Sequence, residues 1–142
     1  MHRLTLVPAV LLPMLLVTAC GGGDDDAAPG AAREIAVTAN DELRFDPAAI
    51  SAKPGEKVVI VVSNTGRIDH ELVIGDAAYL DGHAEGGEHE GHADADGGAS
   101  VAVAAGKTAR LAFTMPKDVA PTYACFVDRH DKAGMTGTVT YT

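Results

Sequence analysis

Short runs of β-branched and other apolar residues recur along residues 33–142, and clusters of Gly, Pro, Asn and Asp separate them. Several of the runs alternate between large apolar and small or polar positions, as "LAFTM" (111–115) does, and this period of two is typical of half-buried strands. The pattern predicts strands at residues 34–39, 48–52, 57–63, 70–75, 100–104, 108–115, 122–126 and 136–142.

Seven or eight short strands in about 110 residues, without a long stretch of helical periodicity, predict an all-β domain. The expected architecture is an antiparallel β-sandwich of the Greek-key type, because turn signals such as "KPGE" (53–56) and "SNTG" (63–66) stand between the strands. Between the first two strands, residues 40–48 predict a bend or a single helical turn.

The first 32 residues differ in composition from the predicted domain. Residues 1–19 begin with a basic residue and continue into a Leu/Val-rich run, which is typical of a secretory signal peptide. The run ends at "VTAC", which resembles a bacterial lipobox, so Cys20 is the predicted lipid-bearing residue and 20–32 a flexible acidic tether. An uncleaved N-terminal anchor is the alternative. Both predict an exported domain, in the periplasm or at the cell exterior, attached to a bacterial membrane.

Cys125 is the only cysteine within residues 33–142. An unpaired cysteine in an exported domain tends to be a metal ligand or a reactive thiol. A disulfide between Cys20 and Cys125 is the competing interpretation, but a flexible tether gives such a bond little to hold, and the lipobox already explains Cys20.

The chain carries a formal net charge of −9, and its acidity is local. Asp24, Asp25 and Asp26 lie in the tether, and seven further acidic residues lie in 76–100, which contains no Lys or Arg. The remainder of the domain is close to neutral. This distribution argues against a nucleic-acid partner.

The stretch "YACFVDRHDKAGMTG" (123–137) places Cys125, His130 and Met135 at equal spacings of five residues. A thiolate, an imidazole and a thioether together favour copper over zinc or the hard cations. His70 opens the apolar run "HELVIG" just after a turn, so it can face a loop at the same end of a sandwich. His70, Cys125 and His130 are therefore the predicted trigonal ligands of one type 1 copper ion, with Met135 as the long axial ligand.

These residues stand in segments that resemble the cupredoxins, the blue copper family of plastocyanin, azurin and auracyanin. The resemblance lies in "NTGRIDHELVI" (64–74) and "YACFVDRHDKAGMTGTVTY" (123–141), and the Cys-x4-His-x4-Met spacing is similar to the auracyanin and rusticyanin loop. It implies a copper-binding sandwich in which Gly134 and Gly137 let the backbone turn tightly around Met135. "HELVIG" also resembles exported cupredoxins that handle copper.

The sequence departs from the family pattern at two places. Glu71 follows the first histidine, where electron carriers often have an Asn that braces the cysteine loop. Asp128 and Arg129 precede His130, where the family usually has Pro-Gly or Gly, and charged residues flank this histidine in place of an apolar docking patch.

The low-complexity stretch 76–100 is an acidic insertion that contains His83, His89 and His92. One interpretation is a solvated, mobile insertion between two strands. The other is a weak second metal site formed by the three histidines and neighbouring carboxylates.

Taken together, these features predict a blue copper protein that carries single electrons at the outer face of a membrane. The alternative is a copper-binding homeostasis protein that buffers, stores or delivers copper without redox turnover. The expected partners are redox proteins at the membrane, or a copper donor or acceptor, and the protein is expected to be a monomer and not an enzyme. A binuclear copper centre needs two cysteines on one loop, and this domain has only Cys125.

Overall fold

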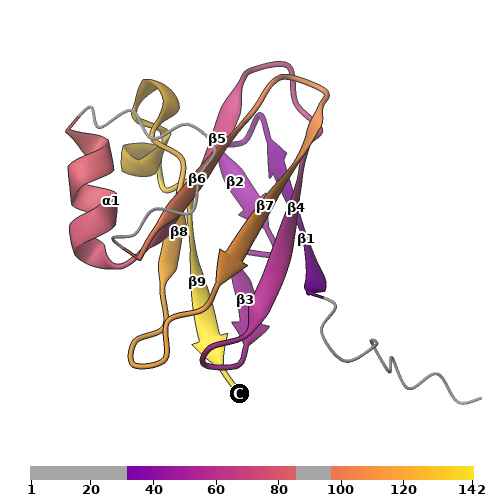
Figure 1. Cartoon of the computed structure of the whole chain (residues 1–142). Coiled ribbons are helices and arrows are strands. Elements are labelled where there is room, and N and C mark those ends of the chain that lie inside the picture. Colours follow the sequence, from indigo (N-terminus) through magenta and orange to yellow (C-terminus); the bar gives the residue numbers. More distant parts are fainter. Residues whose placement is uncertain (1–31, 86–96) are drawn as a thin grey trace, which may run out of the picture.

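The computed structural model describes residues 32–85 and 97–142, which form a β-sandwich with one helix at its side (Figure 1). The strands are β1 (Arg33–Asn40), β2 (Arg44–Asp46), β3 (Ala49–Ala52), β4 (Lys57–Asn64), β5 (His70–Gly75), β6 (Ala99–Val103), β7 (Thr108–Thr114), β8 (Thr122–Ala124) and β9 (Thr136–Tyr141). The helices are α1 (Ala77–Ala84) and the 3₁₀ segment η1 (Val127–Ala133).

The strands form two sheets that pack face to face. One sheet has the order β2-β1-β4-β7 and the other β3-β9-β8-β5-β6. Alternation along each strand directs one set of side chains inward, as the strictly alternating burial of β4 illustrates. The core between the sheets is built mainly from Val, Ile and Leu, with Phe45 and Tyr123 meeting edge to face at a centroid distance of 5.3 Å.

The all-β sandwich class is confirmed, and each of the eight predicted runs contains a strand. Three details differ. The segment expected to bend near residues 40–48 contains the additional strand β2, so the described residues hold nine strands. Strand pairing is mixed, because β1 lies parallel to β4 and β3 lies parallel to β9. The first residues of the acidic stretch, between β5 and β6, form the helix α1, of which most residues are exposed and Tyr79 is buried.

Helix α1 begins at a side-chain cap and is docked against the sheet. Asp76 accepts a hydrogen bond from the backbone N–H of Tyr79 at 2.9 Å, which satisfies a donor that the first helical turn leaves open. Tyr79 is buried over Gly75 and Gly98, where added Cβ atoms would lie 2.7 and 2.2 Å from its ring. The two glycines therefore let the ring lie flat on the sheet. Within the described ranges, no helix has the length and apolar character needed to cross a membrane.

Candidate metal centre

The predicted copper ligands come from two parts of the chain that meet at one end of the sandwich. His70 is the first residue of β5, and Cys125 directly follows β8, which pairs antiparallel with β5. His130 lies in η1, and Met135 immediately precedes β9. One strand start and one connecting loop thus supply all four side chains.

The structure brings three of these side chains into one buried group. The donor atoms of His70, Cys125 and His130 all lie within 4.8 Å of one another. The Sγ atom of Cys125 is 3.8 Å from Nδ1 of His70 and 3.4 Å from Nδ1 of His130. All three residues are buried, with 1%, 0% and 8% of their surface exposed. Among the described residues, this is the one cluster of three or more His, Cys, Asp or Glu side chains with metal-binding spacing.

Met135 belongs to the same buried region and helps to close the ligand loop. Its side chain is fully buried in the core cluster that also includes Cys125. Its carbonyl oxygen accepts a hydrogen bond from the N–H of Cys125 at 3.1 Å, and its own N–H donates to the carbonyl of His130 at 3.0 Å. The backbone between Cys125 and Met135 is therefore tied together by its own hydrogen bonds.

The backbone before His130 is left-handed at two non-glycine residues. Asp128 has φ 44° and ψ 30°, and Arg129 has φ 63° and ψ 35°. This conformation places the Cβ of an L-residue close to its own backbone, and such strained residues concentrate at functional sites. The family usually has Pro-Gly or Gly before this histidine, whereas this chain makes the tight turn with Asp128 and Arg129, two residues that carry a Cβ.

Glu71 contacts the cysteine loop although it replaces the expected Asn. Its backbone N–H points to Cys125 Sγ at 3.4 Å, and its side-chain Oε1 accepts a hydrogen bond from the N–H of Phe126 at 3.0 Å. Glu71 therefore braces the cysteine loop, although the residue type differs from the Asn that is usual at this position.

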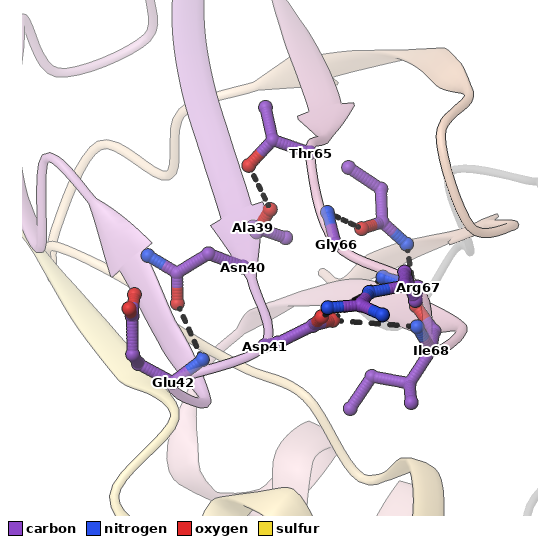
Figure 2. A network of polar contacts seen from close by, with 9 residues as sticks. Ala39, Asn40, Asp41, Glu42, Thr65, Gly66, Arg67 and Ile68 are labelled. Carbon is purple, nitrogen blue, oxygen red and sulfur yellow. Dashed lines mark hydrogen bonds and ion pairs between the residues drawn. The ribbon is translucent and has the colours of Figure 1, made fainter.

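The loop that leads into His70 is held by buried and half-exposed polar side chains (Figure 2). Asp41 Oδ1 accepts hydrogen bonds from the N–H groups of Arg67 and Ile68, at 2.7 and 3.4 Å. Asn64, only 3% exposed, accepts from the N–H of Gly66 at 2.9 Å and donates to the carbonyl of Ile68 at 2.8 Å. This network fixes the approach to β5. Sequence reasoning missed Asp41 and Asn64, although "SNTG" marked the turn.

Of the three histidines of the acidic stretch, only His83 lies within the residues that the structure describes. His83 lies on α1, where its Nε2 is 3.3 Å from Oε2 of Glu71. His89 and His92 lie outside the described residues, so the weak second metal site stays a prediction.

Burial sets the protonation behaviour of the donor group. It raises the pKa of the Cys125 thiol to about 11, against the smaller opposing effect of the N–H groups of Glu71 and Val127. Burial also lowers the pKa of His70, and the electrostatic effect of the neighbouring His130 lowers it further. At neutral pH the site therefore holds a neutral thiol and a neutral imidazole at His70, ready to exchange a proton for a soft cation.

The donor set fits copper. Two imidazoles and a thiol sulfur meet within reach of one ion, and a buried thioether lies on the same loop, a combination of soft and borderline ligands that suits copper of the type 1 class. A β-sandwich with this group at one end defines a cupredoxin.

The chain belongs to the copper binding proteins of the plastocyanin/azurin family, whose model matches residues 31–142. It is 41% identical to a protein named "Copper-resistant cuproprotein CopI" of Rubrivivax gelatinosus, over 83% of this chain and 71% of that protein. A protein of the same name in Vibrio cholerae is 34% identical, over 76% of this chain and 66% of that protein. Among solved structures, the auracyanin of Roseiflexus castenholzii has a TM-score of 0.66 at 22% identity and covers 80% of this chain and 99% of its own, a likeness of fold. The cofactor of this chain is copper.

Proposed function

We propose that this protein holds one copper ion through His70, Cys125, His130 and Met135, and that it handles excess copper outside the cytoplasm. The observation that carries copper handling over electron transfer is the 41% identity, across most of the chain, to a protein named for copper resistance. The buried group of His70, Cys125 and His130 supports the ligand assignment, because its donors are already gathered and suit copper.

The residues of the site favour tight retention of the ion over catalysis on a substrate. Burial of the three clustered donors restricts access, and the ties between Cys125 and Met135 hold the loop closed. Copper, when bound, supplies a one-electron couple between Cu(II) and Cu(I). We therefore propose a binding protein that exchanges copper with a donor or acceptor protein and does not act as an enzyme.

Single-electron transfer is the second candidate function. It is favoured by the hydrogen-bonded ligand loop, because donors whose positions are held by the backbone need to move little between two oxidation states. In that case the partners would be redox proteins at the membrane.

We also propose that the mature protein is exported and attached to a bacterial membrane through a lipid on Cys20. The support is the leader-like run 1–19 and the "VTAC" sequence at its end. Recovery of the protein in the detergent phase, and its loss from that phase in Cys20→Ala, would agree with this anchor. A water-soluble protein whose N-terminus lies beyond residue 20 would contradict it.

Growth on copper tests the main proposal. A strain that lacks the protein should become copper-sensitive, and the full chain should restore tolerance whereas Cys125→Ser should not. Full restoration by Cys125→Ser would contradict copper handling at this site.

The electron self-exchange rate of the purified copper protein distinguishes electron transfer from copper storage. A carrier exchanges electrons rapidly, whereas a protein that only stores copper has no such requirement.

A further inference from the structure

The carboxyl group of Glu71 connects the ligand loop to helix α1. One oxygen, Oε1, accepts the hydrogen bond from the N–H of Phe126, the residue directly after Cys125. The other oxygen, Oε2, lies 3.3 Å from Nε2 of His83 on the helix. The side chains of Glu71 and His83 are 18% and 9% exposed, so this bridge is largely shielded from water.

Two aromatic rings lie close to the His83 ring. Its ring centroid lies 6.5 Å from that of Tyr79, one helical turn earlier, and 5.5 Å from that of Phe126 on the ligand loop. Tyr79 is itself pressed onto Gly75 and Gly98. The helix therefore presents His83 to Glu71 from a fixed position. Figure 1 shows α1 at the side of the sandwich, next to the segment between β8 and β9.

We propose that His83 is a positioning residue of the copper site and that it acts through Glu71. By bonding Oε2, His83 holds the Glu71 carboxyl in the orientation in which Oε1 receives the Phe126 N–H. That bond fixes the peptide after Cys125, and with it the direction of Sγ. Residues that orient metal ligands in this way typically change metal affinity by about 10–100-fold when they are removed.

This inference rests on the ligand assignment proposed above, but it concerns a different role for His83 from the weak second site suggested by the sequence. A residue of a loose metal site would act together with His89 and His92. The positioning role proposed here requires Glu71 and needs neither His89 nor His92. The two roles therefore predict different variants with altered copper binding.

Substitution of His83 in the full-length protein tests the proposal. His83→Phe keeps a ring next to Tyr79 and Phe126 but removes the bond to Glu71. We expect about tenfold weaker copper binding and a changed ratio of the visible thiolate-to-copper absorption bands. Asp81→Asn, an exposed position on the same helix, and the double variant His89→Gln/His92→Gln should leave both readouts unchanged. An unchanged His83→Phe protein would overturn the proposal.

A double-mutant cycle identifies the route of the effect. In a Glu71→Ala background, His83→Phe should change copper affinity by less than about twofold, because the bridge is already gone. An undiminished tenfold effect in that background would mean that His83 does not act through Glu71, and the proposal would be wrong.

The amide resonance of Phe126 in the copper-free protein gives a second measurement that needs no bound metal. Glu71→Ala should move this resonance by removal of its acceptor, and His83→Phe should move it in the same direction, whereas Asp81→Asn should not. An unmoved resonance in His83→Phe would overturn the proposal. If Phe126 responds as expected but copper binds without Cys125, the ligand assignment fails while the role of His83 toward the loop stands.

Discussion

The backbone N–H of Cys125 donates to the carbonyl oxygen of Met135 across 3.1 Å, so the two ends of the ligand loop are joined directly. The N–H of Met135 also donates to the carbonyl oxygen of His130, which lies between these two residues in the sequence. Three of the four proposed ligands are therefore placed by hydrogen bonds of the polypeptide itself. These bonds help to hold the donors near one another, which lowers the entropic cost of gathering them around an ion.

Replacing the thiol should remove the colour of the copper protein. The purified protein with Cu(II) is expected to have an intense visible thiolate-to-copper band, or a green variant of it, because Sγ of Cys125 lies among the donors. Absorption spectra should lose this band in Cys125→Ser and have a disturbed band in His70→Ala. A colourless copper complex of the unchanged protein would contradict a type 1 site.

Copper binding should release one proton from Cys125. The thiol, with its pKa raised to about 11, is protonated at neutral pH, but it binds copper as thiolate. His70 contributes no proton at pH 7 because its pKa is lowered. The apparent affinity should therefore increase about tenfold per pH unit between about pH 7 and 9. Competition titrations at several pH values measure this slope. In Cys125→Ser the number of protons released per bound copper should fall by one. A flat profile in the unchanged protein would be the contrary result.

A methyl group at Gly137 should destabilise the sandwich. An added Cβ would lie 2.0 Å from the ring of Tyr123, which is fully buried and donates its hydroxyl to the carbonyl of Pro47 at 2.8 Å. We expect Gly137→Ala to lower the free energy of unfolding by about 1–3 kcal/mol in denaturant titrations.

Gly82→Ala is the matched control for this clash. No atom lies within 4 Å of a Cβ at Gly82, and its place inside α1 favours alanine, so the free energy of unfolding should rise by up to about 1 kcal/mol. Equal effects of the two substitutions would mean that the contact with Tyr123 is not the cause.

Relief of the left-handed backbone before His130 should stabilise the copper-free protein. Arg129→Gly places at φ 63° a residue without Cβ, and we expect a gain of about 1 kcal/mol in the free energy of unfolding. Gly134→Ala makes the opposite change at φ 93° and should cost a similar amount. Thermal and denaturant unfolding of the two proteins check the signs. A loss of stability in Arg129→Gly would show that its side chain contributes more than the backbone strain costs.

The strands were predictable because each carries its own alternating pattern. The grouping of His70, Cys125 and His130 was predictable because these residue types stand at strand and loop positions that meet at one end of a sandwich. Strand β2 (Arg44–Asp46) has a single apolar residue between two charged ones, so no apolar run marks it in the sequence. The parallel pairing of β1 with β4 depends on how distant segments meet, which the alternation within one strand does not encode.

Helix α1 and its contact with the site were missed for a related reason. Its eight residues include Gly82, and a single residue, Tyr79, anchors it in the core, so no apolar stripe marks it in the sequence. The bond between His83 and Glu71 exists only because that ring docks on two glycines of the sheet. Glu71 was noticed as a replacement for Asn, but its two partners were not visible from the sequence.

His70 and Cys125 stand 55 positions apart in the chain, and the pairing of β5 with β8 brings them together. A contact between such distant segments forms only when much of the domain is already in place. A nascent or damaged chain still offers Cys125, His130 and Met135 on one loop, but His70 is not beside them. The complete four-ligand site therefore forms only as the two sheet segments come together, so acquisition of copper by all four ligands is coupled to folding.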